Sequence, residues 1–170
     1  MHRTTFVART RIPASAEAVF DWHEAPGAFE RLTPPWERVR VLSHEGGIRD
    51  GARVSLLVGP APFRLRWDLE HRDYQHGRSF TDVQRRGPFR HWTHVHRMIP
   101  QGPHASVLED TIEYELPLGA LGWLFGRPLV ARKLTRLFAY RHAVTLHSFE
   151  GQPVGAEIRL AAPTEGHRPE

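Results

Sequence analysis

Most of this chain consists of short segments in which apolar and polar residues alternate, separated by turns rich in glycine and proline. Alternation with a period of two is typical of a β-strand with one buried face. Such segments occupy residues 6–12, 39–43, 53–58, 63–71, 78–85, 87–98 and 105–116. The turns carry pairs such as Gly46-Gly47, Asp50-Gly51 and His76-Gly77. Because tight turns join antiparallel neighbours, we predict an antiparallel sheet of about seven strands.

Helical signals flank this run of strands. Ser15 is a typical N-cap for a short helix over residues 15–22, and Pro26 opens a second short helix over residues 27–32. From residue 127 to residue 149, apolar residues recur at roughly helical spacing and predict one long helix. The preceding segment 119–126 contains three glycines. It is either a mobile gate beside the long helix or a tight strand-to-helix turn.

Composition excludes several kinds of site. The chain has no cysteine, which excludes disulfides, thiolate metal sites and cysteine nucleophiles. No apolar run approaches the roughly 20 residues of a membrane-spanning helix, and the N-terminus lacks the apolar core of a secretory signal. We therefore expect a soluble cytoplasmic protein whose residues 3–149 form one domain. Residues 150–170 are rich in proline and glycine, and we expect a partly disordered tail there.

The charge pattern argues against a nucleic-acid partner. The net charge is +4, from 23 basic and 19 acidic residues, and the two signs alternate along most of the chain. A nucleic-acid groove requires clustered positive charge. The one concentration of basic residues is in segment 127–141. If Arg132, Lys133 and Arg136 were exposed together, the helix could serve as an interaction module for an acidic partner, although we do not expect contact with a membrane.

The strand over residues 87–98 carries the most unusual side chains. Alternation places one set of residues on a single face: Trp92, His94, His96 and Met98. Trp92 and Met98 mark this face as the interior one, and His91 belongs to the opposite face. Two imidazoles among apolar groups are costly to bury unless they are hydrogen-bonded or line a wet cavity. The strand therefore predicts an internal pocket with polar groups on its walls.

The same phase brings polar residues of neighbouring strands to this interior face: Asp82, Gln84, Asp110 and Tyr114. Residues directly opposite on antiparallel strands lie about 4.5–5.5 Å apart at Cβ, so we expect Asp–His pairs that raise the histidine pKa. These pairs either form one buried network that fixes strand register or line a ligand-binding cavity. Aromatic residues that line a pocket or fill the core complete the candidate ligand-binding set: Trp67, Phe80, Trp92 and Trp123.

Two chemical roles are alternatives for these polar residues. An Asp–His pair can serve as general acid and base on a carbonyl substrate, and the candidates are His94 and Asp110. Two histidines two residues apart on a strand, together with an aspartate, also satisfy the spacing of metal ligands. However, 12 histidines are scattered over the chain, and several fall at expected turns, His71 among them. We therefore predict no metal and no cofactor, and we expect surface or helix-packing positions for His91 and His142.

The order of elements is that of a helix-grip fold, in which a curved antiparallel sheet wraps around one long helix. Motifs support this: Phe80-Thr-Asp-Val-Gln84, Trp92-Thr-His-Val-His96 and the segment from Glu109 to Pro117. Over residues 3–149 the chain resembles the SRPBCC superfamily of START and pollen-allergen proteins. Its motifs are similar to those of a bacterial polyketide cyclase/dehydrase-like, ligand-binding branch.

The resemblance implies a cavity between the sheet and the C-terminal helix. Our leading prediction is that this cavity binds a hydrophobic small molecule of lipid, polyketide or aromatic type. The family also implies an alternative: the protein is a lyase, either a cyclase or a dehydratase, that uses the same cavity. One fold hosts many functions, so the resemblance identifies neither the ligand nor a reaction.

Overall fold

The computed structural model describes residues 3–150, except for the side chains of residues 120 and 121. One sheet contains β1 (Arg3–Ile12), β2 (Val39–Glu45), β3 (Arg53–Val58), β4 (Leu65–Gln75), β5 (Ser79–Arg86), β6 (His91–Pro100) and β7 (Ser106–Glu115). Its order is β1-β7-β6-β5-β4-β3-β2, and every neighbouring pair is antiparallel. The predicted seven-stranded antiparallel sheet is confirmed.

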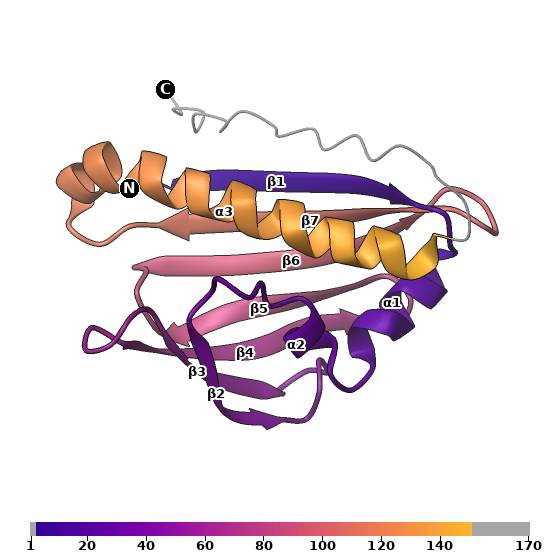
Figure 1. Cartoon of the computed structure of the whole chain (residues 1–170), viewed down its shortest axis with the longest axis horizontal. Coiled ribbons are helices and arrows are strands. Elements are labelled where there is room, and N and C mark those ends of the chain that lie inside the picture. The colour runs from indigo at the N-terminus through magenta and orange to yellow at the C-terminus, as the bar shows by residue number, and fades with distance from the viewer. Residues whose placement is uncertain (1–2, 151–170) are drawn as a thin grey trace.

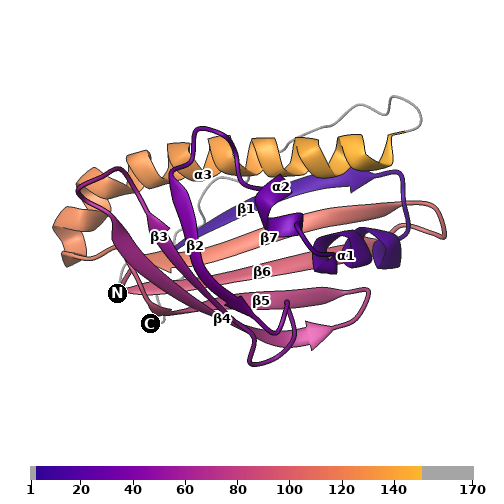
Figure 2. The ribbon, with the colours of Figure 1, turned by 60° about the horizontal axis from the view of Figure 1, so that its bottom comes forward.

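Three helices complete the fold: α1 (Ala16–Glu24), α2 (Ala28–Arg31) and α3 (Gly119–Phe149). The predicted cap is present, because the Ala18 N–H donates to Ser15 Oγ over 3.2 Å. Figure 1 shows α3 running along the sheet beside β1 and β7, and Figure 2 shows the strands curving beneath it. The helix-grip arrangement is therefore confirmed. No helix within residues 3–150 combines the length and apolarity needed to cross a bilayer.

The long helix begins at Gly119 rather than at residue 127, so the interpretation of segment 119–126 as a strand-to-helix turn was wrong, and a gate there stays a prediction. Its glycines permit close packing against the end of β7. A Cβ at Gly122 would lie 1.8 Å from the Pro117 carbonyl oxygen, and one at Gly126 would lie 3.0 Å from Leu116 Cδ1. Pro128 lies inside the helix and removes one backbone donor. Figure 2 shows the first turns of α3 bent away from the rest of the helix.

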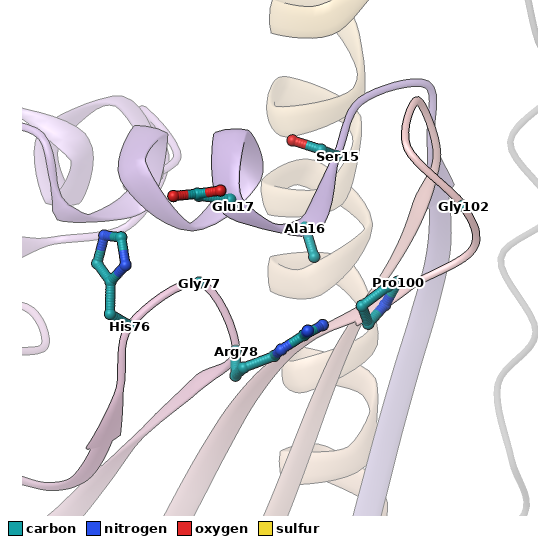
Figure 3. A pocket seen from close by; sticks show the side chains of 8 residues that line it. All are labelled: Ser15, Ala16, Glu17, His76, Gly77, Arg78, Pro100 and Gly102. Carbon is teal, nitrogen blue, oxygen red and sulfur yellow. The ribbon is translucent and has the colours of Figure 1, made fainter.

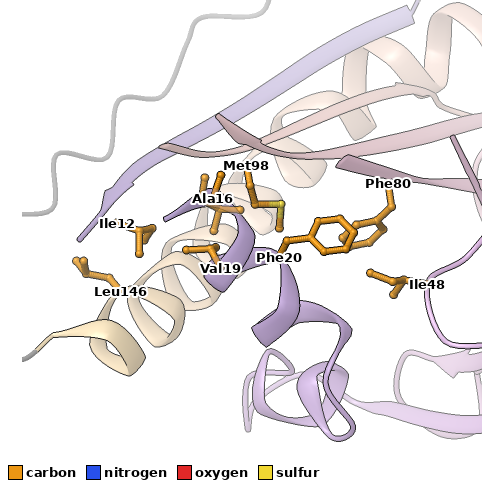
Figure 4. Close-up of a cluster of buried hydrophobic side chains, with 9 residues drawn as sticks. Ile12, Ala16, Val19, Phe20, Ile48, Phe80, Met98 and Leu146 are labelled. Atoms are coloured by element: carbon orange, nitrogen blue, oxygen red, sulfur yellow. The ribbon is translucent and has the colours of Figure 1, made fainter. Parts of the chain in front are cut away.

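Two apolar clusters occupy the interior. The first lies where α1 and the C-terminal end of α3 meet the sheet (Figure 4), and it contains Ile12, Ala16, Val19, Phe20, Ile48, Phe80, Met98, Leu108 and Leu146. The second joins β1, β6 and β7 to the middle of α3, and it contains Phe6, Ala8, Trp92, Ile112, Tyr114, Leu134 and Phe138. Together they pack α3 against the concave face of the sheet.

Some positions differ from the predicted pattern. The alternation of segment 63–71, with Trp67 facing inward, predicts that Phe63 and Leu65 also point inward, yet they are 79% and 54% exposed. Leu65 pairs with Val58 at the last position of β3, so Phe63 lies in the connecting loop, outside the sheet. Leu137 is only half-buried, at the edge of the second cluster. The predicted tail, apart from Glu150, lies outside the described residues.

Replacing Phe138 with alanine tests the placement of α3. Phe138 is 2% exposed and packs on Phe6 with ring centroids 5.4 Å apart. We expect Phe138→Ala to lower the free energy of unfolding by about 3–5 kcal/mol, since it leaves a cavity in the second cluster. Leu129→Ala, at an exposed position of the same helix, should change it by no more than about 0.5 kcal/mol. Equal losses in urea titrations would contradict this placement.

Candidate functional site

Six ionisable side chains meet on the concave face of the sheet, and we call them the Asp–His cluster: His71, Asp82, His94, His96, Asp110 and His142. The sheet register brings five of them together. His71 of β4 pairs with Asp82 of β5, Asp82 pairs with His94 of β6, and His96 of β6 pairs with Asp110 of β7. His142 comes from α3 above the sheet. The predicted alternation of β6 is confirmed, because Trp92, His94, His96 and Met98 are all buried.

Asp110 is the central acceptor of the cluster. Its Oδ1 lies 2.7 Å from His94 Nε2 and 2.7 Å from His96 Nδ1. Its Oδ2 accepts from His142 Nε2 over 2.7 Å, and His142 Nδ1 lies 2.8 Å from the Thr10 hydroxyl. A carboxylate only accepts, so His94 Nε2 and His142 Nε2 carry the protons of their hydrogen bonds, and the His96 contact is an ion pair. One carboxylate thus links β6, β7 and α3, and His142 extends this network of polar contacts to β1.

Asp82 makes a looser set of contacts. Its Oδ2 accepts from His96 Nε2 over 3.2 Å and lies 3.6 Å from His94 Nδ1. Its Oδ1 lies 3.0 Å from His71 Nε2. That second contact lacks hydrogen-bond alignment, so Oδ1 is a buried oxygen without a hydrogen bond to any described residue. Asp82 is therefore close to three imidazoles but well bonded to only one.

Burial and mutual charge separate the two histidines of β6. Burial alone would lower the pKa of His96, but the carboxylates of Asp110 and Asp82 outweigh it and raise that pKa to about 9. Burial, reinforced by the neighbouring positive His96, lowers the pKa of His94 to about 4. Burial also opposes ionisation of Asp82 and Asp110, yet the surrounding imidazoles hold both carboxyl pKa values well below their usual range. At neutral pH the site contains two carboxylates, an imidazolium and a neutral His94.

Aromatic rings enclose the two β6 imidazoles. Phe80 stacks on His96 with ring centroids 4.1 Å apart and an interplanar angle of 15°. Phe138 meets His94 edge-on at 5.2 Å. Trp92 lies beyond His94 and packs against Trp67 at 5.0 Å and Phe89 at 4.7 Å. The charged groups thus lie on a small polar patch bordered by aromatic surface.

Not every predicted site residue joins this patch. Gln84 is inward but its amide is engaged by a loop, since Nε2 donates to the Phe89 carbonyl over 2.7 Å. The Tyr114 hydroxyl is hydrogen-bonded to Thr4. Trp123 precedes His142 by 19 positions on α3, which corresponds to about 28 Å of helix. Trp123 therefore lies too far along the helix to share a polar contact with the cluster.

Two members of the cluster were missed from sequence. His71 was assigned to a turn, but it is a buried residue of β4. The sequence does contain a signal for this burial. His71 follows Trp67 and Leu69 at the same two-residue spacing, so continued alternation places it on their buried face. His142 was expected at the surface or in helix packing, yet it is 1% exposed and bonded to Asp110. It follows Phe138 by four positions, so it shares the apolar face of the helix.

Half-buried apolar side chains surround the second cluster, and we call them the apolar rim: Trp67, Leu69, Phe89, Leu116, Val130 and Leu137. They come from β4, the β5–β6 loop, the end of β7 and α3. Trp67 Nε1 is buried without a hydrogen-bond partner among the described residues. An indole N–H can only donate, so this buried position holds one unsatisfied donor beside the apolar rim.

A separate pocket of about 310 Å³ opens at the far end of the sheet (Figure 3). It lies between the start of α1 and two hairpin turns, and it is lined by Ser15, Ala16, Glu17, His76, Gly77, Arg78, Pro100 and Gly102. None of these residues belongs to the Asp–His cluster or to the apolar rim. The internal cavity expected from sequence stays a prediction.

Removing the charge of Asp110 should destabilise the fold. Asp110→Asn leaves the buried His96 imidazolium with a weaker set of acceptors, and breaking a buried pair in this way costs about 3–5 kcal/mol. Asp21→Asn is the matched control, because Asp21 is 55% exposed in its pair with His76 and its loss should cost at most about 1 kcal/mol. Chemical denaturation of both variants at neutral pH measures the difference. Similar midpoints and slopes for the two would contradict the central role of Asp110.

Histidine labelling tests which face of β6 is buried. Diethyl pyrocarbonate should modify His147 and His76 rapidly, since their side chains are 73% and 52% exposed. His94 and His142 should react slowly, and half-buried His91, on the outer face of β6, should react faster than His94. Peptide mapping over a time course gives the order. Faster labelling of His94 than of His91 would show that the strand is phased the other way.

Comparisons with solved structures agree with this fold. Norcoclaurine synthase from Thalictrum flavum, in complex with dopamine and hydroxybenzaldehyde, is 15% identical with a TM-score of 0.66, covering 90% of each chain. ZhuI aromatase/cyclase from Streptomyces sp. R1128 is 17% identical with a TM-score of 0.67, covering 86% of this chain and 93% of that one. A START superfamily protein from Mycobacterium smegmatis is 13% identical with a TM-score of 0.62, covering 86% and 97%.

At these identities the likeness shows the fold alone. A comparison with curated proteins gave no match. The profile of the family described as "Polyketide cyclase / dehydrase and lipid transport" matches residues 12–138, which is most of the chain. That span contains every residue of the Asp–His cluster except His142. The chain therefore belongs to the polyketide cyclase/dehydrase and lipid transport family.

Proposed function

We propose that the protein binds a hydrophobic small molecule carrying an oxygen acceptor, between the concave face of the sheet and α3. The observation that carries this proposal is the free indole N–H of Trp67 on the apolar rim. A buried donor without a partner is costly unless a ligand satisfies it. A carbonyl, hydroxyl or phenol oxygen on an apolar skeleton matches that donor and the rings around it.

The position of Trp67 supports this orientation. Its ring packs on Trp92 and Phe89, and Trp92 in turn lies 6.4 Å from His94 between ring centroids. A ligand that places its oxygen at Trp67 Nε1 would extend along Trp92 toward the Asp–His cluster. A second polar group on the ligand would then face the charged patch. The candidate ligand residues are Trp67, Phe80, Asp82, Trp92, His94, His96, Asp110 and Tyr114.

The family supports the same class of ligand, because polyketides and lipids are hydrophobic molecules with few oxygen atoms. Arg132, Lys133 and Arg136 are all exposed, as the interaction-module alternative requires, but two of these three cations already have partners within the chain. Lys133 Nζ lies 3.0 Å from Glu37 Oε2, and the Arg136 guanidinium lies over the Trp36 ring at 4.3 Å. Both cations therefore hold the loop between α2 and β2 against the helix.

Two small probes test the proposal. 1-Naphthol has an apolar skeleton and one oxygen, and naphthalene lacks that oxygen. We expect the full chain to bind 1-naphthol more tightly than naphthalene, with a change in tryptophan fluorescence. Trp67→Phe removes the donor and reduces the ring, so naphthalene affinity should fall slightly while 1-naphthol affinity falls by up to about tenfold more.

Trp22→Phe is the matched control, because Trp22 lies on α1 and packs against Phe149 at the C-terminal end of α3, and it should leave both affinities unchanged. Native mass spectrometry of untagged protein should also show a bound hydrophobic molecule in a 1:1 complex that is released chemically unchanged. Absence of binding to both probes would overturn the proposal. Release of a cyclised or dehydrated product would favour the lyase alternative instead.

A further inference from the structure

Three side chains of the Asp–His cluster bring one possible metal-ligand atom each close together. They are Asp82, His94 and His96, and these three atoms lie within 4.8 Å of one another. His94 and His96 share a face of β6 because they are two residues apart, with ring centroids 3.8 Å apart. Asp82 faces them from β5, directly opposite His94. The backbone register alone therefore creates this convergence.

We propose that Asp82, His94 and His96 bind a divalent transition-metal ion such as Zn²⁺. Metal–ligand bonds of about 2.0–2.2 Å place tetrahedral ligand atoms about 3.3–3.6 Å apart. Asp82 Oδ2 lies 3.2 Å from His96 Nε2 and 3.6 Å from His94 Nδ1, which brackets that spacing. The ion would take the place of the proton that now joins His96 Nε2 to Asp82 Oδ2.

The groups behind these three ligands form the support that metal sites require. A metal-binding histidine almost always donates its other ring N–H to a carboxylate or carbonyl. Here His94 Nε2 donates to Asp110 Oδ1 over 2.7 Å, and His96 Nδ1 lies 2.7 Å from the same oxygen as an ion pair. Asp110 is itself held by His142, and Asp82 Oδ1 faces His71 Nε2 at 3.0 Å. All three ligands are thus oriented by buried partners.

The donor set selects the class of ion. Two imidazoles and one carboxylate favour Zn²⁺, Fe²⁺ or Co²⁺ over Mg²⁺ or Ca²⁺, which prefer oxygen ligands. Three protein ligands also leave coordination positions free for water or a bound molecule, as in catalytic zinc sites. The site goes beyond the proposed small-molecule binding and does not depend on it, because Trp67 is not one of its ligands.

A second group of possible ligands provides an internal comparison. Asp21, Glu24 and His76 also place three ligand atoms within 4.8 Å of one another, but at the surface. Glu24 already accepts from the Tyr74 hydroxyl over 3.0 Å and from Arg49 Nε over 3.2 Å. No second carboxylate orients its one histidine in the way that Asp110 orients His94 and His96 within the described part of the chain. It therefore serves as the control group.

The experiment uses untagged full-length protein freed of metal with a chelator. Zn²⁺ is titrated and measured by calorimetry, and Co²⁺ is followed by its visible ligand-field bands. We expect one ion per chain. Asp82→Asn and His94→Gln should weaken binding by more than the roughly 10–100-fold expected for a supporting residue. His91→Gln, on the outer face of β6, and His76→Gln, in the surface group, should leave the affinity unchanged.

Each outcome is decisive. Binding that persists in His94→Gln but is lost in His76→Gln would overturn the proposal, as would less than one bound ion per chain in the parent protein. Should a ligand variant fail to fold, X-ray absorption of the Zn²⁺-loaded parent decides. Two imidazole nitrogens in the coordination shell support the site, and a shell with one or none overturns it. The 1-naphthol assay on Trp67→Phe is independent of each of these results.

Discussion

The burial of Asp110 is the interaction on which the arrangement of this protein depends. An ionised carboxylate in the interior is stable only when its oxygens are saturated by donors. Asp110 is saturated by His94 and His96 from β6 and by His142 from α3. The helix must therefore lie at one particular position along the sheet, so that His142 reaches Asp110. The apolar clusters on either side hold α3 in place, and this carboxylate specifies its register.

The curved sheet explains why so many charged groups share one small volume. The order β4-β5-β6-β7 places four strands side by side, and each contributes a polar residue at one of two adjacent levels. Their backbone pairing holds His71, Asp82 and His94 on one level of the concave face, and His96 and Asp110 on the next. Strands are rigid supports, so the distances between these side chains vary little. This rigidity suits a site that must hold either a ligand or an ion in one geometry.

The polar patch and the apolar rim are complementary parts of one interior. The rim provides area for a hydrophobic skeleton, and the indole N–H of Trp67 provides one point of polar recognition. The patch lies deeper, behind Trp92, where aromatic rings reduce the access of water and strengthen each electrostatic contact. An ion on Asp82, His94 and His96 would face the same interior. Family membership supports a hydrophobic ligand, whereas the metal proposal rests on the geometry of this chain.

Much of the fold was predictable from the sequence. Alternation in the strand segments, turn residues between them and the helical spacing beyond residue 127 were enough to predict the sheet, its antiparallel pairing and the helix across it. The alternation of Trp92, His94, His96 and Met98 also predicted the buried face of β6. These features are local, because each depends on the chain's own period of two or 3.6 residues. The family resemblance placed them in the helix-grip arrangement.

Other features depended on tertiary contacts. Glycine spacing alone did not show that residues 119–126 are helical, since packing against Pro117 and Leu116 decides it. Sequence gave no reason to group His142 with Asp110, because 32 positions separate them and only the docking of α3 joins them. The engagement of Gln84 by the Phe89 backbone likewise depends on loop closure. The sequence by itself determined which residues of one strand share a face, because side-chain direction follows backbone period. Only the tertiary structure decided which residues of different elements touch, because contacts between distant segments depend on how whole elements pack.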